Sequence, residues 1–298
     1  MVNRMSFRPG QGEVAPSRQQ VDSREMPGRI LVRPLLVLAP HMDDETLGCG
    51  GTMALHEDKR KIHCVFCTDG AASPAPLLPW QGRVDPALPE RRRQEAAAAL
   101  GVLGVPPENL HFLDLPDGRL AAHRKELRAL LAALITRLRP DFVFAPFRYD
   151  VHTDHVAVNR AARSALLDVP VPPALLEYFV YNRLRFVPGG DVRQALDRDR
   201  LVEIDTTSVA QLKREALDCH ATQTRVDYPW QERPILTAES MALRCGEPER
   251  FLRSDPAAAL DDGVVDHAWR ISLGTLAMRH GKRPKDRAVA FLRWAVGR

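Results

Sequence analysis

Residues 35–45 read LLVLAPHMDDE, and this stretch decides the fold. Its apolar first half predicts a buried strand, and a histidine and three acidic residues follow where that strand ends. Residues 142–155 repeat the arrangement as FVFAPFRYDVHTDH, an apolar run that leads into two histidines and two aspartates. In open α/β sheets, ligands bind at the carboxyl ends of the strands. We therefore expect both polar clusters at one edge of a sheet.

Strand-like and helix-like segments alternate along the chain from about residue 29. We predict strands at 29–39, 61–68, 110–115, 142–146, 175–181 and 201–204. We predict helices at 45–58, 89–103, 120–138, 154–167 and 207–220. This order predicts an α/β fold with a mostly parallel sheet and helices on both faces.

The length and composition suit a single folded domain. The chain has 298 residues, of which 45% are hydrophobic and 27% charged, so it can bury a sizeable core. Residues 1–28 are rich in Arg, Gln, Pro, Gly and Ser and are predicted to form a flexible tail. The domain then spans 29–298, with a catalytic core at about 33–225 and a C-terminal extension at 230–298.

Several functional classes are disfavoured by the same numbers. The formal net charge of +4 is too small to indicate a nucleic-acid partner. No apolar run approaches the ~20 residues that a membrane span needs, and the N-terminus lacks the apolar stretch of a signal peptide. We therefore expect a cytoplasmic protein that is not an integral membrane protein, and a homo-oligomer stays compatible with the sequence. The C-x-x-C pair Cys64 and Cys67 lies inside a predicted strand, which favours core packing over a redox role.

The C-terminal segment 282–298 is basic and carries an apolar stripe at helical spacing. We expect this segment to dock on the protein's own core, with contact to a membrane surface as the alternative.

The two polar clusters together predict a metal site. Two histidines and one carboxylate, with further positions open to water, form a common catalytic zinc arrangement, and a neighbouring carboxylate can act as the base. Alone, the Asp43–Asp44 pair would be a helix N-cap and His152–His155 a polar surface pair. Their shared position after two strands favours the metal site. Asp154 can hold a ring nitrogen of a neighbouring histidine.

The motifs PHMDDE at 40–45 and HTDH at 152–155 closely resemble the two signatures of the PIG-L/LmbE-like zinc-dependent deacetylases. The resemblance extends to RRQE at 92–95, to LDLPDG at 113–118 and to a late Lys…His…Gln helix at 213–223. One departure is Met42, where the family usually has proline; that position supplies no side-chain chemistry. The resemblance implies a Rossmann-like three-layer sandwich.

The resemblance also implies roles for individual residues. It implies one Zn²⁺ per chain, or another divalent metal, held by His41, Asp44 and His155. It implies Asp43 as the general base and His152 as an electrophilic or general-acid histidine that Asp154 orients.

We expect three further residues to bind substrate. The resemblance makes Arg92 a candidate for gripping a sugar or a phosphate on it, and we also assign Asp150 to substrate binding. The Pro-rich loop 69–88 is long enough to wall off a pocket, where Trp80 could stack on a sugar ring. The same loop could instead be a subunit contact.

The resemblance implies removal of an acyl group, usually acetyl, from an amino sugar or an N-acetylglucosamine-type glycoside, releasing acetate and a free amine. One alternative is an amidase of the same chemistry that acts on a thiol conjugate or another non-sugar acyl amine. A remoter alternative is a non-catalytic sugar- or nucleotide-binding protein, which the retention of Asp43 beside the full ligand set disfavours.

Overall fold

A seven-stranded sheet forms the centre of the computed structural model, which describes residues 25–74, 82–150, 152–181, 192–196 and 198–258. The strands are β1 (Leu35–Ala39), β2 (Ile62–Thr68), β3 (Leu110–Leu115), β4 (Phe142–Pro146), β5 (Ala174–Tyr178), β6 (Leu201–Ile204) and β7 (Glu249–Ser254). Their order across the sheet is β3-β2-β1-β4-β5-β7-β6. The first five strands pair in parallel, whereas β7 pairs antiparallel with both β5 and β6.

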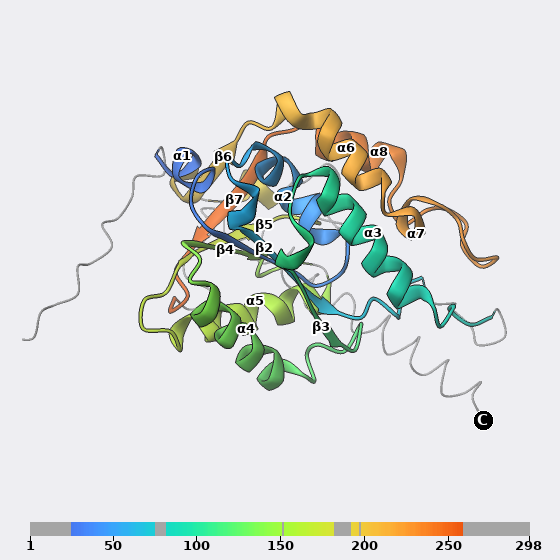
Figure 1. Cartoon of the computed structure of the whole chain (residues 1–298), viewed down its shortest axis with the longest axis horizontal. Coiled ribbons are helices and arrows are strands. Elements are labelled where there is room, and N and C mark those ends of the chain that lie inside the picture. Colours follow the sequence, from blue (N-terminus) through green and yellow to red (C-terminus); the bar gives the residue numbers. More distant parts are fainter. Residues whose placement is uncertain (1–24, 75–81, 151, 182–191, 197, 259–298) are drawn as a thin grey trace, which may run out of the picture.

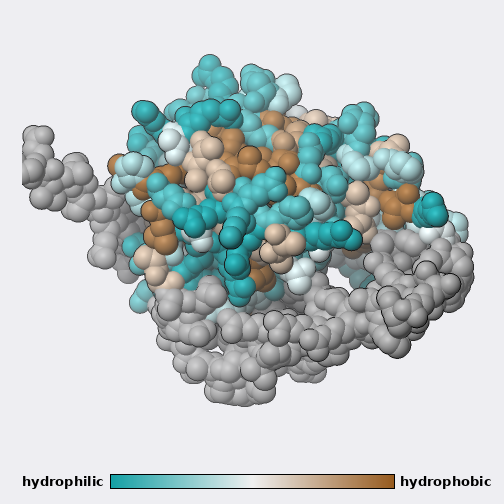
Figure 2. All heavy atoms as spheres, turned by 90° about the horizontal axis from the view of Figure 1, so that it is seen from below, coloured by the Kyte–Doolittle hydropathy of each residue, from teal (hydrophilic) through white to brown (hydrophobic). Residues whose placement is uncertain are grey.

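Helices cover both faces of this sheet, as Figure 1 shows. One layer holds α2 (Asp44–Leu55), α3 (Leu88–Val102), α6 (Ala210–Asp218), α7 (Ala221–Thr224) and α8 (Ala238–Cys245). The opposite layer holds α4 (Arg124–Leu138) and α5 (Thr153–Leu167). On the side where α4 and α5 lie, hydrophilic residues dominate the coloured surface and hydrophobic residues form small groups (Figure 2). The predicted α/β class, with a mostly parallel sheet between two helical layers, is confirmed.

The central strand β1 explains why its sequence is apolar without interruption. Leu35, Val37 and Ala39 point into the core under α2 and α3, while Leu36 and Leu38 point into the core under α4 and α5. All five residues of β1 are buried. A strand covered on both faces has no reason to alternate between apolar and polar residues.

The N-terminal boundary differs from the prediction. Residues 29–34 do not extend β1, because the helix α1 (Met26–Ile30) and a turn precede it. Pro27 lies in the first turn of α1, where a missing N–H costs nothing, and Pro34 cannot donate to the sheet ladder. Met26 and Ile30 are buried in the core, so the packed structure begins inside the region predicted as a tail.

The extension after residue 230 contributes to the main sheet, which the sequence did not predict. Strand β7 inserts between β5 and β6, and α8 packs beside α6. The segment 282–298 lies outside the described residues, so its predicted docking stays a prediction. Within the described residues, no helix is both long and apolar enough to cross a lipid bilayer.

Candidate metal and catalytic site

The two polar clusters meet at the point where the strand order reverses. His41, Asp43 and Asp44 follow β1, and residues 150–155 follow β4, its parallel neighbour. β1 leads to β2 on one side and lies against β4 on the other, which makes this edge the topological switch point of the sheet. The predicted juxtaposition of the two clusters is therefore confirmed.

Asp44 lies at the centre of the cluster. Its Oδ2 atom is 3.1 Å from His41 Nδ1 and 3.1 Å from His155 Nε2, and it also accepts a hydrogen bond from the His41 backbone N–H at 2.9 Å. The side chains of Asp44, His41 and His155 are 4%, 12% and 1% exposed. One carboxylate oxygen and two imidazole nitrogens thus converge where they are almost fully shielded from solvent, as is typical of a metal site.

Further carboxylates lie behind the two rings. His41 Nε2 is 3.2 Å from Asp117 Oδ1 and 3.3 Å from Asp154 Oδ2, and His155 Nδ1 is 3.2 Å from Asp150 Oδ2. Histidines that bind metals usually present their outer nitrogen to such a partner, which fixes the tautomer that leaves the inner nitrogen free. The residues present therefore fit a divalent metal, because His41, His152 and His155 offer ligand atoms within 4.8 Å of one another and Asp44 lies against two of these rings.

The shifted pKa values of the two histidines also support a cation site in this cluster. Burial alone would lower the pKa of His155, but Asp44 and Asp150 raise it to about 9. Burial would likewise lower the pKa of His41, but the carboxylates of Asp117, Asp154 and Asp44 raise it well above its ordinary value. The cluster is therefore rich in negative charge, which a divalent cation could offset in place of these protons.

The structure corrects the predicted role of Asp150. Its side chain is 1% exposed, Oδ1 accepts a hydrogen bond from the His152 backbone N–H at 2.9 Å, and Oδ2 faces His155. A carboxylate committed to these two partners has no open side for a substrate. Asp150 instead supports the ring of His155.

Asp154 contacts both neighbouring histidines through different groups. Its backbone N–H donates to His152 Nδ1 at 3.2 Å, so the proton of a neutral His152 ring lies on Nε2. Its carboxylate accepts hydrogen bonds from the backbone N–H groups of Gly118 and Leu120 and lies against the His41 ring. His152 is half-buried, and its ring centroid lies 4.6 Å from that of His41.

Asp43 lies beside Asp44 with Arg92 behind it. Asp43 Oδ1 is 3.8 Å from Arg92 Nη2. Burial and the charge of Asp44 raise the pKa of Asp43 to about 6, although Arg92 lowers it. Arg92 is only 2% exposed, and its guanidinium donates to the carbonyls of Gly70 and Met42. This corrects the prediction that Arg92 binds a sugar. Its guanidinium is buried against Asp43 and two backbone carbonyls and does not face open space.

Trp80 lies outside the described residues, so its stacking role stays a prediction. The described ends of the loop that contains Trp80 pack against Trp230. Trp230 Nε1 donates to the Pro74 carbonyl at 3.2 Å. Gly82 lies so close to the Trp230 ring that an added Cβ would be 2.3 Å from it. Trp230 also stacks on Tyr228, with ring centroids 4.7 Å apart.

The helix that carries Asp44 is anchored by residues from late in the chain. Glu249 on β7 accepts hydrogen bonds from the backbone N–H groups of Gly51 and Thr52, and from Lys213 Nζ at 2.7 Å. Lys213 also donates to the Leu47 carbonyl. Both charged side chains are buried, so this ion pair fixes α2 against α6 and β7.

Two contributors to the site were missed from the sequence. Asp117 lies in the turn after β3, at the same sheet edge as the two clusters, and that position was the signal that could have found it. Tyr181, whose ring centroid is 5.7 Å from that of His155, follows β5 in the same way.

The chain is similar to known proteins both in sequence and in structure. The family model described as "PIG-L: GlcNAc-PI de-N-acetylase" matches residues 36–166. A 1D-myo-inositol 2-acetamido-2-deoxy-alpha-D-glucopyranoside deacetylase from Rhodococcus jostii is 31% identical over 266 residues, covering 71% of this chain and 91% of the relative. The diacetylchitobiose deacetylase of Thermococcus kodakarensis is 30% identical over 129 residues, covering 42% of this chain and 45% of the relative.

Among solved structures, the conserved protein TT1542 from Thermus thermophilus is similar with a TM-score of 0.52 and 25% identity. The match covers 77% of this chain and 98% of that structure. The described fold is thus shared over nearly the whole length of a solved relative.

Proposed function

The chain belongs to the PIG-L/LmbE family of N-acetylglucosaminyl deacetylases, and we propose that it is a zinc-dependent hydrolase that removes the N-acetyl group from an amino sugar or an N-acetylglucosamine-type glycoside. The products are acetate and a free amine. The observation that carries this proposal is the position of Asp44 Oδ2, 3.1 Å from one nitrogen of each of His41 and His155, with Asp43 beside it.

In this proposal His41, Asp44 and His155 hold one zinc ion per chain. A bound zinc ion supplies Lewis acidity, which polarises an amide carbonyl and makes water more acidic. Asp150, Asp117 and Asp154 hold the outer nitrogens of the two rings, so the inner nitrogens stay available as ligands.

Asp43 accepts the proton of the attacking water. It is adjacent to Asp44 but turned toward Arg92, and its pKa near 6 suits a base that works close to neutral pH. Arg92 supports this role because its buried guanidinium holds the Asp43 carboxylate and the Met42 carbonyl in place.

His152 faces the same space with a protonated Nε2, because its Nδ1 accepts from the Asp154 backbone. In that tautomer the ring can donate a hydrogen bond to the oxyanion that develops on the amide carbonyl. The proton that Asp43 accepted from the water can then pass to the leaving amine, which must be protonated before it departs.

The proposed substrate class is supported by the curated relatives, whose names specify an N-acetylglucosaminyl inositol and diacetylchitobiose as what they deacetylate. We propose a small soluble glycoside of this kind for the present chain. An amidase of the same chemistry would use the same metal and base but a different acceptor.

The test combines metal analysis with a substrate panel. We expect one zinc per chain in the wild type and none in His155→Ala. His123→Ala should keep its zinc, because His123 is a half-buried histidine that pairs with Glu126. Primary amine release should be fastest with a small N-acetyl glycoside among N-acetyl sugars, UDP-N-acetylglucosamine, acylated thiol glycosides and chitin.

Stoichiometric zinc in His155→Ala would overturn the ligand assignment. Faster release from an acylated thiol conjugate than from any sugar would replace the amino-sugar substrate by the amidase alternative.

A further inference from the structure

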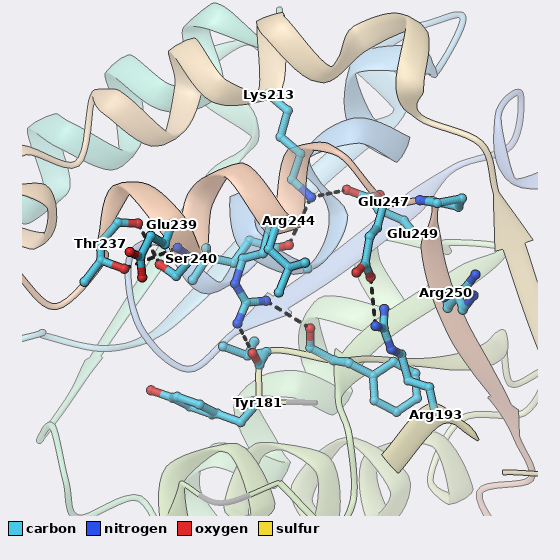
Figure 3. A pocket seen from close by; sticks show the side chains of 16 residues that line it. Tyr181, Arg193, Lys213, Thr237, Glu239, Ser240, Arg244, Glu247, Glu249 and Arg250 are labelled. Carbon is cyan, nitrogen blue, oxygen red and sulfur yellow. Dashed lines mark hydrogen bonds and ion pairs between the residues drawn. The ribbon is translucent and has the colours of Figure 1, made fainter. Parts of the chain in front are cut away.

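A cavity of about 560 Å³ lies beside the metal and catalytic site. The proposed metal binding and amide hydrolysis do not use it. Its wall is built from the start of α2, the chain that follows β5, helix α8 and the beginning of β7 (Figure 3). Leu47, Val180 and Leu243 form apolar parts of the wall. Arg244 and Tyr181 provide polar groups.

The cavity borders the metal site through residues that neighbour the proposed ligands and not through the ligands themselves. Tyr181 lines it and also packs against the ring of His155, with centroids 5.7 Å apart. Leu47 and Gly48 line it from α2, one helical turn after Asp44. A molecule whose acyl group reaches the metal site can therefore place its remaining part in this cavity.

Arg244 differs from the other cations of the wall. Arg193 pairs with Glu247 at 2.8 Å, Lys213 with Glu249 at 2.7 Å and Arg250 with Glu203 at 2.6 Å. Arg244 donates only to the backbone carbonyls of Val180 and Phe179, and within the described residues no carboxylate forms an ion pair with it.

The guanidinium of Arg244 is thus a sheltered charge that forms no ion pair among the described residues. Burial lowers its pKa, the direction expected for a cation that is partly removed from water, although Tyr181 and the more distant carboxylates of Asp44, Asp150 and Asp43 act in the opposite direction. A guanidinium has five N–H donors, and two carbonyls leave most of them available. Glu239, the lining carboxylate without an ion pair among the described residues, is exposed in the first turn of α8 and does not reach Arg244.

We propose that this cavity binds an acidic group of the substrate, a phosphate or a carboxylate, through Arg244. This inference rests on the proposed deacetylase function and specifies the part of the substrate that lies beyond the N-acetyl group. An anionic oxygen would provide the charge-assisted partner that the carbonyls of Val180 and Phe179 cannot. A neutral hydroxyl would satisfy a donor but leave Arg244 without an ion pair.

The experiment compares four substrates of the zinc-loaded full-length protein: methyl N-acetylglucosaminide, its carboxymethyl counterpart, N-acetylglucosamine 1-phosphate and N-acetylglucosamine 6-phosphate. The measured quantity is the ratio of kcat/KM for each acidic sugar to that for the neutral one. We expect the wild type to favour at least one acidic sugar, and its identity tells which end of the sugar enters the cavity and whether phosphate or carboxylate is preferred.

Arg244→Gln should reduce that ratio by roughly 10- to 100-fold, the usual worth of a hydrogen bond to a charged group. Arg244→Lys should restore part of it, because it keeps the charge but not the planar fork. Arg250→Gln is the matched control: it removes a charge from the same wall, but one already paired with Glu203, and should leave the ratio within about 3-fold.

Equal kcat/KM for acidic and neutral sugars in the wild type would overturn this inference and leave the deacetylase proposal intact. An equal loss on all four substrates in Arg244→Gln, with zinc content and melting temperature unchanged, would also overturn it. No amine release from any of the four sugars would overturn the proposed function itself, and the acidic-substrate inference with it.

Discussion

Asp150→Asn tests whether the carboxylates behind the histidines prepare the metal site. In the wild type Oδ1 accepts from the His152 backbone N–H at 2.9 Å, and Oδ2 lies 3.2 Å from His155 Nδ1. An asparagine has one oxygen and one NH₂ group in these two places. If its oxygen keeps the bond to His152, its NH₂ meets His155 Nδ1 and favours the tautomer with a proton on Nε2. That tautomer cannot bind metal through Nε2, the nitrogen that faces Asp44.

The opposite orientation of the amide is no better, because its NH₂ would then meet the His152 N–H, donor against donor. Both orientations therefore weaken metal binding. Removal of such an outer partner typically costs 10- to 100-fold in metal affinity, which corresponds to about 1.4–2.8 kcal/mol.

The assay is competition for zinc against a chromophoric chelator at neutral pH, with circular dichroism of the apo-protein to check the fold. Asp218→Asn is the control, since that carboxylate is 52% exposed and pairs only with Arg214 on its own helix. Zinc affinity of Asp150→Asn within a factor of two of the wild type would refute the reasoning about the His155 tautomer.

Four further outcomes are expected. Asp43→Asn should keep its zinc but lose roughly 10²- to 10⁴-fold in kcat, and loss of zinc with an intact fold would mean that the base and ligand roles are exchanged. Glu249→Ala should destabilise the protein to urea by about 3–5 kcal/mol, because it leaves the buried Lys213 charge without its partner; a loss below 1 kcal/mol would contradict this. Burial and the charge of Arg92 lower the pKa of His220 to about 3, so its contribution to stability is complete above about pH 6.5 and is lost as the pH falls below it, by roughly 1.4 kcal/mol at pH 5.5; His220→Gln should remove that part of the pH dependence in urea titrations, and identical pH profiles would disprove it. Trp80→Ala should raise KM for a small N-acetyl glycoside without changing zinc content, and unchanged kinetics would argue instead for a subunit contact.

The sequence was informative where one physical requirement determines the residue pattern. A strand covered on both faces must be apolar throughout, and β1 and β4 have this pattern. Parallel strands bring their carboxyl ends to one edge, so the clusters at 41–45 and 150–155 could be placed together without a structure. The strands at 110–115, 142–146 and 201–204 were predicted at their observed boundaries.

Strand β7 shows where such reasoning ends. Its sequence, ERFLRS, places charged residues among apolar ones, and its partners β5 and β6 lie 45 or more residues away along the chain. The buried Glu249 reads as a surface residue until Lys213 and the N–H groups of Gly51 and Thr52 are brought to it by the fold. A charge stabilised only by distant partners leaves no local pattern in the sequence.

The direction of a side chain within a turn is a second quantity that the sequence does not contain. Asp43, Asp44 and Asp150 are all carboxylates next to histidines, yet one faces Arg92, one lies between two imidazoles and one lies behind a ring. These positions differ by the rotation of a few backbone bonds at the end of a strand. That rotation decides whether a carboxylate acts as base, ligand or support, because each role requires a different lone pair to be free. Arg92 follows the same rule: its residue type suits a sugar or a phosphate, but its burial against the Gly70 and Met42 carbonyls directs it to Asp43. Arg244, sheltered but without a carboxylate partner among the described residues, is left as the cation that can meet an acidic substrate group at this edge of the sheet.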